Sequence, residues 1–174
     1  MAGLGLQMQN TAPLLLSSGD PVLFNEVLVD SDPNISYQTA NGQIHFAGAG
    51  EYYVSWFVVI KTAGGVTGAD FSIVTNESVP KYYSAGSGFK NGEITGFALL
   101  DVTDGFEISL QNASSEEISL HDLVQANAGI SILNAVERGA TGMQGPTGPT
   151  ASSIYVQPQE WLASGFLSHS TKQK

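Results

Sequence analysis

The run from Gly50 to Ile60 constrains the fold more than any other part of the sequence. Its residues are aromatic or β-branched almost throughout, a glycine-rich turn at residues 47–50 precedes it, and residues 61–65 (Lys-Thr-Ala-Gly-Gly) end it. A run this apolar is poorly suited to the edge of a sheet, and its β-branched side chains disfavour a helix. We therefore predict a central β-strand with which the other segments pair.

Further short strand-like segments recur at intervals of roughly 8 to 12 residues, separated by turn pairs that tolerate a positive φ. No long segment before the last residues keeps a helical period. The sequence therefore predicts an all-β sandwich or barrel. The predicted strands are 14–16, 22–29, 35–37, 43–46, 52–60, 69–75, 81–83, 94–102, 106–111, 117–120 and 128–136, and the turns are Asn41-Gly42, Gly64-Gly65, 86–88, Asn91-Gly92 and Asp104-Gly105.

The order of these segments resembles that of a known family. The motifs that carry the resemblance are 22–25 (Val-Leu-Phe-Asn), 41–46 (Asn-Gly-Gln-Ile-His-Phe), 49–55 (Ala-Gly-Glu-Tyr-Tyr-Val-Ser), 96–102, 104–110 and 129–133. Together they resemble the C1q/TNF-like jelly roll over residues 13–136. The cysteine-free style, rich in Ala, Gly, Ser and Thr, looks like the bacterial branch of that family, the C-terminal domains of collagen-like exosporium glycoproteins on spores. The resemblance implies a ten-stranded jelly-roll sandwich of two sheets, a tight homotrimer, and both termini at the base of this head.

A second feature follows at residues 138–150, where glycine occupies every third position in four consecutive triplets, two of them Gly-Pro-Thr. The glycines are Gly139, Gly142, Gly145 and Gly148. Three chains can share one axis only where the residue that faces the axis has no side chain, so this period is typical of a collagen triple helix, with a chance glycine-rich loop as the alternative. Twelve residues span only about 37 Å, so this stretch needs a trimer that the head already holds together.

The two ends of the chain are more apolar than solvated tails usually are. Residues 1–12 carry the alternating Leu4, Leu6 and Met8, which fit a short strand with one apolar face, while a frayed terminus is the alternative. Residues 151–174 carry Ile154, Val156, Trp161, Leu162 and Phe166. Trp161, Leu162 and Phe166 share a face if this tail is helical, and Ile154 and Val156 share one if it is extended. We expect both ends to dock on a neighbouring subunit. In the family the collagen repeats usually precede the head, whereas here they follow it.

The charge balance excludes several classes of partner. Six basic and 16 acidic residues give a net charge of -10, which repels phosphate backbones and anionic lipids, so we expect neither nucleic-acid nor membrane binding. No basic and apolar leader of a signal peptide is present at residues 1–7, and no run has the length of a membrane span. The chain has no cysteine, so it has neither a disulfide nor a thiolate metal site.

Candidate chemistry is sparse, and we expect no enzyme, no cofactor and no metal. Residues 30–34 begin like a calcium loop, but Ile35 and Asn41 stand where Gly and Glu are required, so a turn capped by Asp and Asn is the better interpretation. Residues 116–122 and the three histidines lack metal-ligand spacing, and no nucleophile elbow is present. The Asn-X-Ser sequons at Asn34, Asn76 and Asn112 are common by chance. By resemblance to exosporium proteins, the threonines of the triplets are candidates for O-glycosylation: Thr141, Thr147 and Thr150.

These features favour a structural protein of a bacterial spore surface, in the exosporium or an endospore appendage, whose trimers join head to tail into a fibre, with an anchor protein on the spore as a further partner. The alternative is the receptor- or glycan-binding head of a phage tail fibre or surface adhesin, carried on the phage particle.

Overall fold

The computed structural model describes residues 5–63, 68–89 and 91–135, and every regular element within them is a β-strand. The collagen-like run, the tail and Leu4 lie outside the described residues. The described residues contain no helix, and hence none that is long and apolar enough to cross a membrane. Each predicted strand overlaps one of the twelve observed strands, so the all-β prediction is confirmed.

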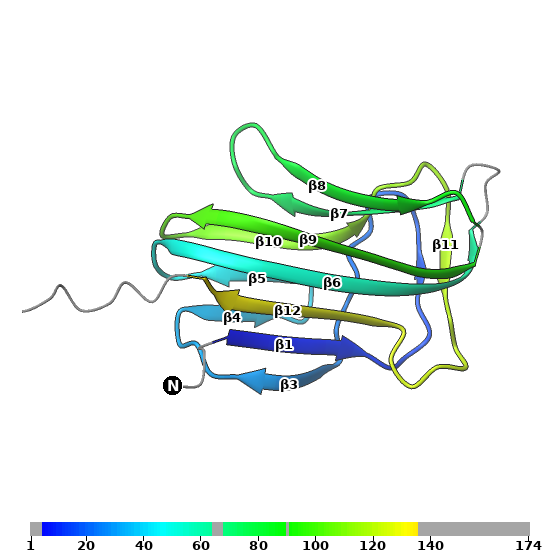
Figure 1. The fold of residues 1–174 in the computed structure, drawn as a ribbon, viewed down its shortest axis with the longest axis horizontal. Helices are drawn as coiled ribbons and strands as arrows, with labels where there is room; N and C mark the ends of the chain where they lie inside the picture. The colour runs from blue at the N-terminus through cyan, green and yellow to red at the C-terminus, as the bar shows by residue number, and fades with distance from the viewer. Residues whose placement is uncertain (1–4, 64–67, 90, 136–174) are drawn as a thin grey trace, which may run out of the picture. The chain divides into compact units, whose positions relative to one another are not determined.

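The larger sheet, sheet A, has seven antiparallel strands and is organised around β6 (Figure 1). One side of β6 pairs with β9 along residues 50–60, and the other pairs with β12 along residues 52–58. The prediction of a central strand at this position is therefore confirmed. The order is β2 (Leu15–Leu16), β11 (Ile118–Leu120), β6 (Gly50–Ala63), β12 (Ala128–Asn134), β1 (Gly5–Asn10) and β3 (Glu26–Asp30), with β9 (Gly92–Val102) on the other side of β6.

The smaller sheet, sheet B, has five antiparallel strands and packs behind sheet A in the view of Figure 1. Its β4–β5 hairpin turns at Asn41-Gly42, as predicted, and Gly42 has a φ of 71°, which a residue with a side chain rarely adopts. The order is β4 (Ile35–Gln38), β5 (Gln43–Phe46), β10 (Phe106–Asn112), β7 (Ala69–Thr75) and β8 (Tyr82–Ser87). The described residues form twelve strands, two more than the ten that the resemblance implies, and β2 and β11 are the two shortest, with two and three residues.

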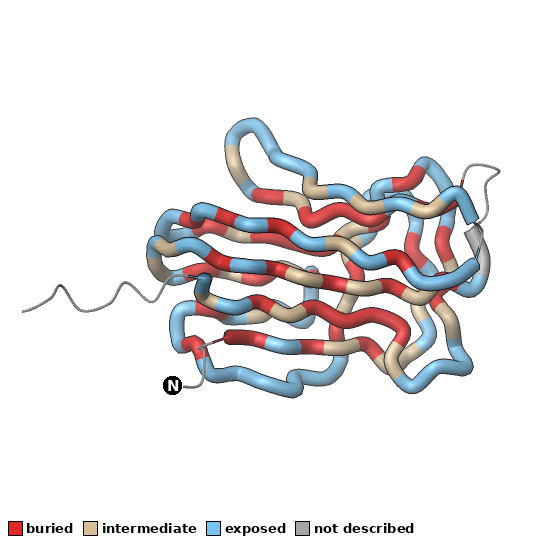
Figure 2. The backbone as a smooth tube through the Cα atoms, in the orientation of Figure 1, coloured by how far each residue is buried: buried red, intermediate tan, exposed pale blue. Residues whose placement is uncertain are grey.

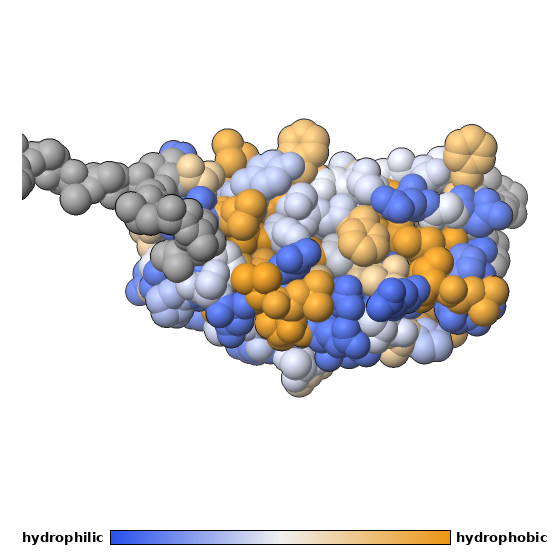
Figure 3. Space-filling model, turned by 60° about the horizontal axis from the view of Figure 1, so that its bottom comes forward, coloured by the Kyte–Doolittle hydropathy of each residue, from blue (hydrophilic) through white to orange (hydrophobic). Residues whose placement is uncertain are grey.

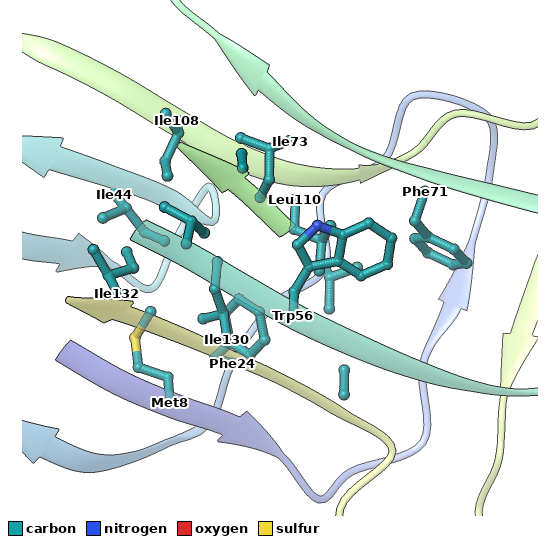
Figure 4. Close-up of a cluster of buried hydrophobic side chains, with 14 of the residues drawn as sticks. Met8, Phe24, Ile44, Trp56, Phe71, Ile73, Ile108, Leu110, Ile130 and Ile132 are labelled. Carbon is teal, nitrogen blue, oxygen red and sulfur yellow. The ribbon is translucent and has the colours of Figure 1, made fainter. Parts of the chain in front are cut away.

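The core lies between the two sheets, because one face of each strand is apolar and points to the other sheet. Figure 2 shows buried residues alternating with exposed ones along most strands. Aromatic side chains join the layers: Phe46 of sheet B lies 4.8 Å from Tyr52 of sheet A, and Trp56 lies 6.4 Å from Phe71, measured between ring centroids. Figure 4 shows Trp56 in the middle of this cluster.

The register defines two ends of the sandwich. β1 begins where β12 ends, because Gly5 pairs with Leu133, and we call this end the base. The opposite end, where Ile60 pairs with Gly92 and where β11 lies, is the apex (Figure 1). Both ends of the described chain therefore leave from the base, as the resemblance implies.

Residues 5–10 are part of the sandwich rather than a separate docking segment. β1 pairs with β12 along its whole length and with β3 on its other side. Leu6 and Met8 are buried in the core, and Figure 4 shows Met8 beside the β12 side chains Ile130 and Ile132. The docking role expected of Leu6 and Met8 is thus replaced by a core role, because their apolar face is already covered by their own chain.

Candidate subunit interface

The outward surface of sheet A, which we call the sheet A face, is the most unusual surface of the described residues. Along β6 the even-numbered residues from Tyr52 to Ile60 are buried, so the odd-numbered ones point outward. The same parity places Phe97 and Leu99 of β9 beside Ser55 and Tyr53 of β6. On β12, Leu133 pairs with Tyr53 and extends the same row.

These outward side chains are apolar and open to solvent. Phe97 is 72% exposed and Leu99 is 63% exposed, and Tyr53 and Leu133 are also exposed. Tyr53 and Phe97 stack at a centroid distance of 6.3 Å and an interplanar angle of 26°, which fixes both rings on the surface. An apolar row of this kind on one sheet face is typical of a surface that contacts another protein.

The edge strand β3 extends the apolar surface. A β-bulge lies where β3 faces Gln7 and Met8, so two residues of β3 oppose one of β1. Leu28 and Val29 are exposed. Leu28 lines one hollow on the sheet A face, and Val29 lines a second one together with Leu133. Figure 3, which brings the β3 edge forward, shows apolar surface interrupted by hydrophilic side chains. The sheet A face therefore comprises Leu28, Val29, Tyr53, Phe97, Leu99 and Leu133.

A hollow of about 500 Å³ lies in the middle of the sheet A face. Its rim carries the side chains of Gln7, Leu28, Tyr53 and Phe97, and Gly129 forms part of its lining. The ring of Phe57 lies over Gly129, since a Cβ at that glycine would come within 2.4 Å of it. The hollow can receive a side chain of a neighbouring molecule, provided that the neighbour has a matching apolar projection.

The charges around this face are acidic. Glu93 lines the hollow, and Glu51 pairs directly with Asp101 across β6 and β9, which places two like charges side by side. Within the described residues, the lysines are Lys61, at the apical end of β6, and Lys81, just before β8. Both are already in ion pairs, with Asp122 at 2.8 Å and Glu77 at 2.9 Å. Anionic partners are therefore disfavoured at this surface.

Sheet B has an ordinary solvated outer face, which makes the contrast informative. Its outward side chains are mainly Ser, Gln, His and Glu, with His45 3.6 Å from Glu107 and Ser72 hydrogen-bonded to Ser84, and Tyr82 of the edge strand β8 is its one large exposed aromatic side chain among the described strand residues. Antiparallel sheets commonly bury one face and solvate the other in this way. Sheet A departs from that pattern, because its outward face carries a row of exposed apolar side chains among polar and acidic ones.

The structure also locates the residues that the sequence analysis rejected as chemical sites. Asp32 caps a turn, since its Oδ1 accepts the backbone N–H of Asn34 at 3.0 Å, which confirms the capped-turn interpretation. His121 Nδ1 accepts the backbone N–H of Leu123, and the hydrogen bond from Lys61 holds the pKa of Asp122 below its usual value. No three His, Asp or Glu side chains of the described part of the chain form a group that could hold a metal ion.

The residues of the sheet A face were not predicted as a contact surface. Phe97, Leu99 and Leu133 entered only as strand residues and as members of the motifs 96–102 and 129–133 that carry the resemblance. One signal could have identified them: the runs 52–60 and 94–102 lack the polar residue at every second position that a half-solvated strand has. The docking and glycosylation candidates at residues 141–166, and the collagen glycines, lie outside the described residues.

Comparison with known proteins supports the fold and nothing finer. No protein-family model matches the sequence, and no curated protein does. Among solved structures, the chain is similar to the globular domain of zebrafish complement 1qA protein, with a TM-score of 0.60 and 13% identity over 76% of this chain and 98% of that one. It is also similar to the Eiger TNF from S. frugiperda (TM-score 0.63, 10% identity, 84% and 98% covered) and to murine APRIL (0.56, 9%, 75% and 97%). The described residues therefore form a C1q/TNF-like jelly roll.

Proposed function

We propose that this chain is a structural protein of a bacterial spore surface, and that its heads associate as a homotrimer through the sheet A face. The observation that carries the proposal is the contrast between the two sheets: apart from Tyr82 on its edge strand β8, sheet B presents mainly polar side chains to solvent, whereas sheet A presents a row of exposed aromatic and aliphatic ones. Covering the exposed part of each such side chain contributes roughly 1 kcal/mol. Exposure of this apolar surface to water is unfavourable, and another copy of the chain is the simplest molecule that can bury it.

Three copies, rather than two, are supported by a feature outside the head. The four Gly-X-Y triplets from Gly139 to Thr150 need three chains on one axis, and a run so short needs the head to hold those chains together. The collagen-like run begins a few residues after β12, which ends with Asn134 at the base, so the chains of a trimer enter that run from one end of their heads.

The spore surface and the fibre rest on the sequence. The combination of this head with Gly-X-Y triplets resembles the exosporium glycoproteins, in which threonines of the triplets carry O-glycans, so Thr141, Thr147 and Thr150 remain the modification candidates. Because β1 is part of the head, docking between trimers falls to the tail, residues 151–174, with its apolar Ile154, Val156, Trp161, Leu162 and Phe166. An anchor protein on the spore is the further partner that such a fibre requires.

The oligomeric state of the full-length protein tests the proposed interface. We expect the wild-type protein to sediment with a mass of about three protomers of 18.3 kDa, or as assemblies of that unit. The variant Phe97→Glu with Leu99→Glu places charges on the sheet A face and is expected to sediment as a folded single chain. A matched control is Val79→Glu, which changes a residue that is 78% exposed on a loop of sheet B and is expected to leave the trimer intact.

Two outcomes contradict the proposal. A wild-type mass of one protomer at working concentration would show that the protein is not a trimer. An unchanged mass of the double variant would show that the sheet A face is not the trimer interface. Localisation is tested separately by immunogold labelling of intact spores of the source bacterium. Labelling of phage particles instead of spores favours the receptor-binding alternative.

A further inference from the structure

The apex of the head carries a second group of exposed apolar side chains, separate from the sheet A face. Leu123 is 86% exposed, Leu15 is 61% exposed, and Val124 is exposed beside Leu123. Leu15 lies at the apical end of the sandwich because β2 pairs with β11, which pairs with the last residues of β6. Leu123 and Val124 lie there because their loop is hydrogen-bonded to Val59 of β6 at its start and, through Asn127, to Asn10 of β1 at its end. We call Leu15, Leu123 and Val124 the apical patch.

The loop that carries Leu123 and Val124 is anchored on both sides. At its start, the His121 N–H donates to the Val59 carbonyl at 2.8 Å, and Lys61 holds Asp122 at 2.8 Å. At its end, the buried Asn127 donates to the Ala12 carbonyl at 2.8 Å and accepts from Asn10 at 2.7 Å. The loop is therefore held in place on both sides of Leu123 and Val124, and it leaves Leu123 exposed to solvent at the apex.

We propose that the apical patch is the acceptor for the tail, residues 151–174, of a chain in a neighbouring trimer. The inference rests on the proposed function and specifies where trimers join. Residues 136–174 follow the end of β12 at the base, whereas the patch lies at the opposite end. A segment that leaves its own head from one end and binds another head at the opposite end makes a heterologous contact that does not close, and such a contact propagates as a linear filament.

The composition of the two surfaces fits this pairing. The tail supplies apolar side chains, Trp161 and Phe166 among them, together with Lys172 and Lys174. Glu116 and Glu117 are exposed in the segment that leads into β11, beside which Leu15 lies. An apolar contact flanked by lysines on one side and carboxylates on the other gives the pairing a fixed direction.

A crosslinking experiment tests the contact directly, since the chain has no cysteine. Two full-length proteins are purified separately, one with Leu123→Cys and the other with Phe166→Cys, and are then mixed under mild oxidation. We expect a disulfide-linked pair of chains that joins the two proteins. The control replaces Leu123→Cys by Val79→Cys, a position that is 78% exposed in the β7–β8 loop at the base, and is expected to give at least tenfold less of this product.

A second variant separates this inference from the proposed function. Leu123→Ser with Val124→Ser changes exposed loop residues, so the trimer mass is expected to stay, while association between trimers weakens roughly tenfold for each apolar side chain that the variant removes from the apical patch. If trimers still form filaments at the wild-type concentration, or the control crosslinks as well as Leu123→Cys does, the apical patch is not the acceptor, although the trimer stands. If the wild-type trimers form no larger assembly, both the fibre and the acceptor role of the apical patch are wrong. A wild-type mass of one protomer would contradict the proposed function itself.

Discussion

At two positions of sheet A, an aromatic ring lies so close to the backbone that only glycine fits. Gly96 pairs with Trp56 on the core side, and Gly129 pairs with Phe57 on the outer side. A Cβ at Gly96 would come within 2.3 Å of the Trp56 indole, which is buried and cannot swing away. Glycine usually weakens a strand, but here each one provides the space in which a ring lies flat against the sheet.

The substitution Gly96→Ala tests this fit. We expect it to lower the free energy of unfolding by about 1–3 kcal/mol, because the added methyl group overpacks the core beside Trp56. Gly88→Ala is the control, since a Cβ there meets no atom within 4 Å. Urea denaturation of both variants measures the difference, and equal stabilities would show that the indole can move aside.

At the scale of elements, strand positions were predictable from the sequence because short-range patterns determine them. The run around Trp56 is apolar throughout, and Asn41-Gly42 supplies the positive φ that its turn requires. The place of β1 was not predictable in the same way. The alternation of Leu6 and Met8 indicates a strand, but its neighbour β12 lies at the other end of the sequence, and nothing local specifies that pairing.

Because β1 lies between β12 and β3, shortening one of its side chains is expected to destabilise the whole sandwich. Met8 is 1% exposed, so Met8→Ala should lower the free energy of unfolding by about 2–5 kcal/mol. Gln7→Ala, on the exposed side of the same strand, should change it by about 0.5 kcal/mol or less. Chemical denaturation distinguishes the two positions. If Met8→Ala lowers the free energy of unfolding as little as Gln7→Ala does, β1 is only loosely attached, as expected of a docking segment.

Tyr37 connects β4 to the segment before β3, and this connection depends on pH. The backbone N–H of Phe24 donates to its hydroxyl oxygen at 2.8 Å, and burial raises the pKa of Tyr37 above the ordinary value of 10.0. A raised pKa means that the folded state favours the neutral phenol, so the contribution is complete below pH 10.0 and is lost as the pH rises above it.

Tyr37→Phe is therefore expected to have two effects. At neutral pH it costs about 1 kcal/mol, because the Phe24 N–H loses its acceptor. Above the ordinary tyrosine pKa, the stability of the variant decreases less steeply with rising pH than that of the wild-type protein, because the variant lacks one ionising phenol. Thermal unfolding midpoints across the alkaline range test both effects, and parallel pH profiles would rule out a contribution from Tyr37.

At the scale of the whole molecule, the sheet A face shows where prediction from sequence stops. An apolar residue in a strand is assigned to the core by default, and only the pairing of β6 with β9 reveals that Phe97 and Leu99 point away from it. Which apolar residues stay exposed depends on the parity of each strand relative to the opposite sheet, and parity is a property of the assembled sandwich. Self-association was predicted from the glycine period and the resemblance, whereas the surface proposed to mediate it emerged from the fold.

Association of such acidic chains has a consequence that salt can test. Each chain carries a formal charge of -10, and Glu51, Glu93 and Asp101 lie on or beside the proposed interface without a lysine among its described residues. Bringing copies together concentrates like charges, and the repulsion is long-range at low ionic strength, where the Debye length is about 30 Å at 0.01 M against about 8 Å at 0.15 M. We therefore expect the dissociation constant of the trimer, measured by sedimentation equilibrium, to fall as the salt concentration rises over this range.

The variant Glu51→Gln with Asp101→Asn should make the dissociation constant depend less on the salt concentration, because it removes the like-charged pair. Association that weakens with added salt would mean that attractive ion pairs dominate, and the basic residues outside the described head would then be the place to look for them.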